Sequence, residues 1–237
     1  MITDSKHSDD DVGRQGFDEG AFEKSKHRRR MRTAFAIGDW RFAIFALLAL
    51  TPGARAEDAV PVSALRVWLE PKFQHSPVAT PVTGAKATWI AAGTLRADEL
   101  AGLSASAFAA LGISWEQFYA KARENAAADL AGLKPRYERD AKKVIVYAAL
   151  ESEKPVVASA VLAPKFLAMF KDTLGDKLLV VVPNRFTAFV FPRLASHYAE
   201  YTPMVFRAYR ATAWPVSVEV FEVSADGWRG YGAYAEP

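Results

Sequence analysis

The sequence predicts an α+β fold, with a mainly antiparallel sheet and helices packed on one face. Segments with helical periodicity and segments with strand character alternate in the order helix, strand, helix, strand, strand, helix, strand, strand. Two pairs of neighbouring strands are joined by short turns, which is typical of antiparallel hairpins. No internal repeat of solenoid length accompanies this order. A single layered α+β domain is therefore expected.

A helix over residues 115–133 is the element that the sequence defines best. Ser114 and Gln117 have the spacing of a capping box, in which the serine side chain accepts from the third helical N–H and the glutamine reaches back to the cap. Apolar residues then recur near helical spacing. A shorter helix is predicted over residues 104–111, and Gly112 after it suits the left-handed conformation that ends many helices.

The remaining elements follow from β-branched runs and from the positions of proline and glycine. Strands are predicted at residues 88–90, 144–150, 178–182, 186–191, 216–223 and 228–234. Helices are predicted at 164–174, beginning at Pro164, and at 194–211, with Pro203 as a kink. Residues 183–185 are expected to form a turn. The run 156–162 fits either a strand or the start of a helix, because it is too short for its periodicity to decide.

An export signal is predicted at residues 31–56. Basic residues precede the apolar run 42–50, and the small residues that follow a Pro-Gly break suit cleavage near Ala56. The run is less than half of the roughly 20 residues that a membrane-spanning helix needs. Residues 1–30 are then either disordered or upstream of a true start at Met31. The alternative is a cytoplasmic tail on an uncleaved anchor.

After the leader, residues 57–84 are predicted to be a proline-rich arm with one short strand at 65–69, and residues 85–237 the α+β domain. Removal of residues 1–56 leaves 20 basic and 19 acidic residues. The balance indicates no nucleic-acid partner, since no basic stripe remains. The sequence contains no cysteine, which excludes disulfides, thiol catalysis and cysteine-based metal sites.

Two blocks of the sequence have a pattern found in a known family. The first contains Leu111-Gly112-Ile113-Ser114-Trp115 and Ala126-Ala127-Ala128-Asp129-Leu130, and the second runs from Ala158-Ser159-Ala160-Val161-Leu162 through Leu179-Val180-Val181-Val182-Pro183-Asn184-Arg185. Together they resemble the uncharacterised bacterial family "domain of unknown function 1444", over roughly residues 111–223. Because that family has no established activity, the resemblance implies a fold more than a function.

Four residues are candidates for a binding site: Asn184, Arg185, Ser159 and His197. An arginine at a tight turn between strands suits a two-pronged bond to a carboxylate or phosphate, although a structural turn explains it as well. Ser159 and His197 remain by elimination, without a Gly-x-Ser-x-Gly elbow. His197 and Glu200 share a helix face, but a metal site needs three or four ligands, so a solvated face is the alternative. No metal or cofactor is predicted.

These observations favour an exported protein, periplasmic or secreted, that acts as a binding or assembly module for an unknown protein or small molecule. No membrane span is expected to remain after cleavage. The alternative is a hydrolase or transferase with an acidic site, and the sequence does not identify its catalytic residues. A deep pocket with two carboxyl groups of shifted pKa would indicate such an enzyme.

Overall fold

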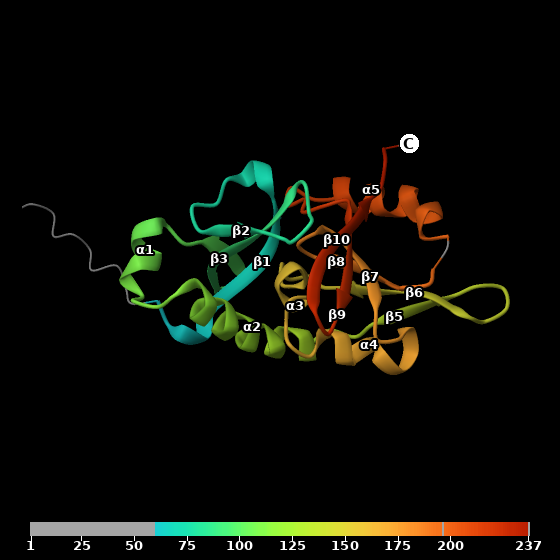
Figure 1. Ribbon diagram of the computed structural model, residues 1–237, viewed down its shortest axis with the longest axis horizontal. Coiled ribbons are helices and arrows are strands. Elements are labelled where there is room, and N and C mark those ends of the chain that lie inside the picture. Colours follow the sequence, from blue (N-terminus) through green and yellow to red (C-terminus); the bar gives the residue numbers. More distant parts are fainter. Residues whose placement is uncertain (1–59, 196, 237) are drawn as a thin grey trace, which may run out of the picture. The chain divides into compact units, whose positions relative to one another are not determined.

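The computed structural model describes residues 60–195 and 197–236, and the predicted leader at 31–56 lies outside them. The predicted α+β class is confirmed. The described chain forms two antiparallel sheets, with five α-helices packed against their strands (Figure 1). All of these residues belong to the unit that spans residues 52–237.

The smaller sheet has four strands, and β3 is its centre. The strands are β1 (Leu65–Pro71), β2 (Ala79–Pro81), β3 (Thr88–Arg96) and β4 (Glu99–Gly102). Strand β1 pairs with β3 along one edge, while β2 and β4 pair with successive parts of the other edge. Every residue of β1 is buried, and its apolar side chains belong to the same core cluster as those of α2, α3, α4 and one face of β7.

The larger sheet has six strands in the order β10-β9-β7-β8-β6-β5, all antiparallel. They are β5 (Arg136–Arg139), β6 (Ile145–Glu151), β7 (Leu178–Asn184), β8 (Thr187–Pro192), β9 (Glu219–Ser224) and β10 (Gly227–Ala233). The predicted hairpins 178–191 and 216–234 correspond to β7–β8 and β9–β10. The short strands β2, β4 and β5 were not predicted.

Helices cover both faces of the larger sheet, whereas the sequence analysis placed them on one. The helices are α1 (Ala105–Ala110), α2 (Trp115–Ala131), α3 (Val157–Ala160), α4 (Phe166–Leu174) and α5 (Thr202–Arg210). Val180 of β7 belongs to the core cluster that contains α3 and α4, and Val181 belongs to the cluster that contains α5. Helices lie on both faces because β7 is apolar along its whole length, so both of its faces have to be buried.

Helix α2 confirms the predicted capping box and packs against β1 and α3. Ser114 accepts from the N–H of Gln117, and the Gln117 side chain accepts from the N–H of Ser114. Gly112 adopts the predicted left-handed conformation, with φ of 64°. Near its end, Asp129 accepts from Arg66 of β1 at 2.7 Å, and both side chains are largely buried. This ion pair fixes α2 to the smaller sheet.

Residues 60–84 are integrated into the fold and do not form an appended arm. The predicted strand 65–69 is confirmed as β1, and residues 79–81 form β2. The prolines fall where they cost no hydrogen bond in the sheet interior, at the end of β1 (Pro71) and in the edge strand β2 (Pro81). The folded unit therefore begins before residue 85.

The predicted helix 194–211 is wrong over its first half. A short 3₁₀ turn covers Tyr198–Tyr201, and α5 begins only at Thr202. Pro203 was expected to kink the helix but lies in its first turn, where the missing N–H has no partner to lose and the fixed φ suits a helix start.

The turn between β7 and β8 covers residues 185–186, whereas the sequence predicts it at 183–185. Pro183 and Asn184 belong to β7, where the pairing with β8 contains an irregularity between Val181 and Asn184. The proline is accommodated because its carbonyl accepts from the N–H of Val216, while its missing donor falls at the irregularity. The turn itself therefore carries Arg185.

The C-terminal strand β10 makes a close contact with the loop before β3. The N–H of Gly230 donates to the carbonyl of Thr83 at 2.8 Å. A Cβ atom at position 230 would lie 2.4 Å from the carbonyl oxygen of Gly84, closer than two such atoms can approach. Only glycine at position 230 allows the strand and this loop to meet in this way.

Candidate functional site

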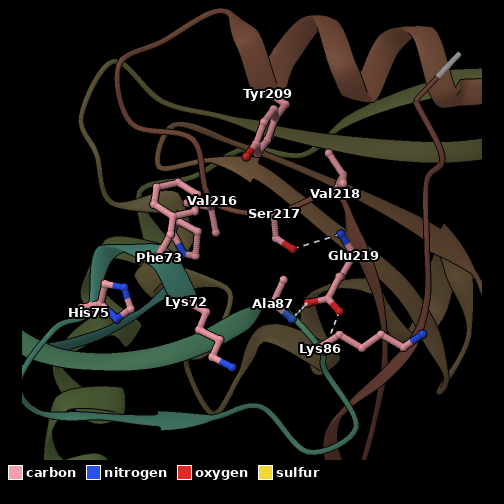
Figure 2. A pocket seen from close by; sticks show the side chains of 11 residues that line it. Lys72, Phe73, His75, Lys86, Ala87, Tyr209, Val216, Ser217, Val218 and Glu219 are labelled. Carbon is pink, nitrogen blue, oxygen red and sulfur yellow. Dashed lines mark hydrogen bonds between the residues drawn. The ribbon is translucent and has the colours of Figure 1, made fainter.

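A surface cavity of about 440 Å³ opens between the two sheets (Figure 2). Four segments line it: the turn after β1 (residues 71–75), Lys86 and Ala87 just before β3, Tyr209 of α5, and residues 216–219 at the start of β9. Its volume lies in the range of small-molecule sites, and most of its wall is apolar. The cavity is therefore the candidate site of the described chain.

The wall formed by residues 71–75 is shaped by its backbone. Pro71 closes β1, a single 3₁₀ turn follows at Lys72–Gln74, and His75 ends it in the left-handed conformation with φ of 52°. The N–H of Lys72 donates to the carbonyl of Ala87 at 2.8 Å, which ties this turn to the neighbouring segment before β3. Phe73 projects from the turn and is 62% exposed, although it is apolar.

The floor of the cavity is a buried polar network centred on Glu219. Its carboxylate accepts from the N–H groups of Lys86 (2.7 Å) and Ala87 (3.1 Å) and from the hydroxyl of Thr88 (2.7 Å). Because the Thr88 proton is committed to this carboxylate, the Ser217 hydroxyl has to donate to Thr88, at 2.6 Å. The Ser217 oxygen in turn accepts from the N–H of Glu219 at 3.0 Å.

The polar groups of this network are hydrogen-bonded to one another and to the backbone, so the network has a structural role in the cavity floor. Thr88, Ser217 and Glu219 are all at least nine-tenths buried. Glu219 connects β9 to the loop before β3, since Lys86 and Glu219 are 133 positions apart along the chain. Both of its carboxylate oxygens are satisfied, as a buried charge requires. The floor thus connects β9 of the larger sheet to the start of β3 in the smaller sheet.

The remaining polar groups of the cavity lie nearer its opening. Tyr209 is half-buried, and its hydroxyl is directed from α5 toward the cavity (Figure 2). Within the described chain, that hydroxyl has no hydrogen bond of its own. Lys72, Lys86 and His75 are exposed at the edge. These groups are available to a bound molecule.

The structure places the predicted candidates Asn184 and Arg185 side by side, away from the cavity wall. The side chain of Asn184 donates to the carbonyl of Ala208 at 2.7 Å and accepts from the N–H of Phe186 at 2.8 Å. It is 2% exposed and fixes the end of α5 to the β7–β8 turn. Its polar atoms are thereby engaged within the protein.

Arg185 is buried between two indole rings. Its guanidinium carbon lies 4.5 Å from the centre of the Trp214 ring and 5.5 Å from that of Trp68, and it donates to the carbonyl of Leu100 at 3.4 Å. Burial lowers the pKa of Arg185, and the neighbouring carboxylate of Glu70 opposes this shift. Such contacts join the turn to the smaller sheet, and the side chain is 6% exposed.

Ser159 and His197 are not brought together. Ser159 lies in α3, fully buried, and its hydroxyl has no hydrogen-bond partner. Helix α3 itself packs against the β7–β8 turn, where the N–H of Val157 donates to the carbonyl of Arg185 at 3.0 Å. His197 is exposed, 3.0 Å from Glu200, beside a smaller cavity of about 250 Å³.

Sequence reasoning missed the residues that form the cavity. One usable signal was present in the predicted strand 216–223, whose alternation places Ser217 and Glu219 on one face with the apolar Phe221 and Val223. Two polar residues on an otherwise apolar face indicate a buried hydrogen-bonded network. The turn with Phe73 gave no such signal, because its segment was assigned to an arm.

Comparisons of the chain with models of protein families, with curated proteins and with solved structures found no match. The resemblance to domain of unknown function 1444 therefore stays a prediction. In the described residues, no helix is long and apolar enough to cross a membrane. Within the same residues, no three acidic or histidine side chains gather closely enough to hold a metal ion.

Proposed function

We propose that the protein is an exported binding module that takes up a small, largely apolar molecule in the cavity between the turn after β1 and the start of β9. The observation that carries the proposal is the cavity itself. It has a volume of about 440 Å³ and mostly apolar walls. A concave apolar site with a few polar groups is the usual form of a small-molecule site.

The state of the polar groups supports binding over catalysis. Glu219 is the carboxylate among the lining residues, and its two oxygens already accept three hydrogen bonds. Acid–base or nucleophilic chemistry needs a group that is free to exchange a proton or attack a substrate. Burial raises the pKa of Glu70, but this residue does not line the cavity. A hydrolase or transferase with an acidic site is accordingly the less supported proposal.

The exported location of this module rests on the sequence of its leader. The apolar run 42–50, with basic residues before it and small residues around Ala56, has the form of a cleavable signal. On this basis the binding activity would operate in the periplasm or outside the cell.

The proposal is tested by filling the cavity with a side chain. Ala87 is exposed and lines the cavity, so an Ala87→Trp variant places an indole in the binding space while leaving the backbone bond to Glu219 intact. The probe is 1-octanol, and isothermal titration calorimetry measures its binding. We expect the wild-type protein to bind it with a Kd of about 1 mM or below, and Ala87→Trp to lose that binding.

The matched control is Ala128→Trp, which adds the same indole on the exposed face of α2. It is expected to bind 1-octanol as the wild type does. Circular dichroism melts show that both variants remain folded. Equal binding by Ala87→Trp and the wild type, or no binding by the wild type, contradicts the proposed site.

A further inference from the structure

We infer that the molecule bound in this cavity is an amphipathic carboxylate, with its apolar part inside and its negative charge at the opening. This inference rests on the proposed function and names the chemical class of the ligand. Three features support this ligand class: the charges at the edge of the cavity, its apolar walls, and the internal hydrogen bonding of Glu219, the acidic residue among those that line it.

The charges at the edge are positive. Lys72 lies in the turn after β1 and Lys86 in the loop before β3, two neighbouring segments that the bond from the Lys72 N–H to the Ala87 carbonyl joins, and both lysines are exposed. The imidazole of His75 lies on the same turn as Lys72. The opposing charge of Glu219 is directed into the floor, where two backbone N–H groups and Thr88 bind it. The Glu219 carboxylate is therefore not paired with Lys72 or Lys86, and both ammonium groups are available to a bound anion.

The lysine side chains keep their charges outside the apolar space of the cavity. In Figure 2 both ammonium groups extend away from the middle of the cavity, while the stems of Lys72 and Lys86 lie along its edge. This is the usual behaviour of lysine, whose apolar stem packs while its charge stays in water. The walls below are formed by Phe73, Val216 and Val218, among others.

Other ligand classes fit this arrangement less well. A sugar or nucleotide needs several polar partners inside the site, and here the inner polar groups Ser217 and Glu219 are bound to each other and to the backbone. An organic cation would gain from the aromatic face of Phe73 or Tyr209, but the lysine charges would repel it. An alkyl or aryl carboxylate fits this site, because its apolar part can pack against the walls and its charge can lie near the lysines at the edge. The Tyr209 hydroxyl is a further donor for the carboxylate.

The inference is tested with three probes of equal chain length: octanoate, 1-octanol and octylammonium. At about pH 7 the first is an anion and the last a cation. Calorimetric titration of the wild-type protein is expected to show octanoate binding about fivefold tighter than 1-octanol, with octylammonium the weakest. Raising the salt concentration from about 0.02 M to about 0.5 M should weaken the binding of octanoate and leave that of 1-octanol unchanged.

A variant with both lysines reversed, Lys72→Glu with Lys86→Glu, is expected to invert the order, so that octylammonium binds tightest and octanoate weakest. The matched control reverses two exposed lysines that do not line the cavity, Lys142→Glu with Lys171→Glu, and keeps the wild-type order. If the double reversal prevents folding, two other measurements provide the same test. One is the salt dependence of octanoate binding by the wild type. The other is a Lys86→Gln variant, which we expect to lose part of the preference for octanoate over 1-octanol.

The outcomes separate this inference from the proposed function. Equal binding of octanoate and 1-octanol, with no effect of the lysine reversal, overturns the carboxylate ligand but leaves a small-molecule site. Tightest binding of octylammonium by the wild type does the same. Binding of none of the three probes removes the proposed function, and the inference with it.

Discussion

Glu70 and Glu219 are both buried, but their carboxylates accept different numbers of hydrogen bonds. Glu219 accepts two backbone N–H groups and a threonine hydroxyl, which are good partners for an anion. Glu70 is 2% exposed and accepts one bond from Ser76, at 2.8 Å. Burial raises the pKa of Glu70, against the opposing influence of the Ser76 bond and of Arg185. At the scale of single residues, Glu70 is thus a group whose raised pKa makes stability depend on pH.

We predict that the stability of the wild-type protein declines as the pH rises above 4.5, the ordinary pKa of a glutamate side chain, relative to a Glu70→Gln variant. With its pKa raised in the folded state, Glu70 holds more protons when folded than when unfolded. The stabilising protonated form is therefore present at low pH and is lost as the pH rises through the folded-state pKa. Urea denaturation at about pH 4.5 and at about pH 7 measures the effect.

Glu153→Gln, at an exposed position, is the control and should follow the wild type at both pH values. If the difference in unfolding free energy between wild type and Glu70→Gln is the same at the two pH values, the raised pKa of Glu70 is refuted.

At the scale of elements, α2 shows how a local sequence signal becomes tertiary structure. The capping box fixes where the helix starts, and Phe118, Ala122, Ala126 and Leu130 then form one fully buried stripe. Trp115, in the first turn, is only half-buried, stacked 6.0 Å from Tyr119. The first turn is therefore held by its cap and by partial aromatic packing.

We predict that Ser114→Ala lowers the free energy of unfolding by about 1 kcal/mol, because the N–H of Gln117 loses its acceptor at the start of α2. Thermal or urea denaturation measures the loss. Ser63→Ala, at an exposed serine whose hydroxyl makes no hydrogen bond within the described chain, should change stability by less than about 0.5 kcal/mol. Equal stabilities of the two variants would show that the capping box contributes nothing.

Elements with local signals were predicted well, and those that depend on tertiary partners were not. The capped helix α2 and the apolar strand β7 follow from their own residues. Strand β5, with the sequence Arg-Tyr-Glu-Arg, has no apolar alternation and is formed only through its pairing with β6. The start of α5 was misplaced because proline is compatible both with a kink and with a first helical turn.

At the scale of the whole described unit, the cavity could not be predicted, because it belongs to no single element. Its walls come from the turn after β1, from the loop before β3, from α5 and from the start of β9. These segments meet only because the two sheets pack against each other. The hairpin residues Asn184 and Arg185, which were expected to bind a ligand, instead support that packing. A sequence pattern identifies such a site only after the sheets have been placed.

The export prediction also concerns the whole protein. We expect the protein recovered from the periplasm of a bacterial host to begin at or near Glu57, since cleavage near Ala56 would release it from the apolar run 42–50. Amino-terminal sequencing and intact mass determine the start. A host strain with a temperature-sensitive signal peptidase should accumulate the longer form. Recovery of the periplasmic protein with residues 1–40 intact would contradict the cleavage.

The contact between Gly230 and Gly84 has a consequence for how this protein tolerates sequence change. Position 230 lies on a largely exposed terminal strand, where surface positions ordinarily accept many residues. Here a methyl group would push on the loop that carries Lys86 and Ala87. Random mutagenesis should therefore recover as few substitutions at position 230 as at positions in the core. Variants there would distort the edge of the cavity at Lys86 and Ala87, although residue 230 does not line the cavity.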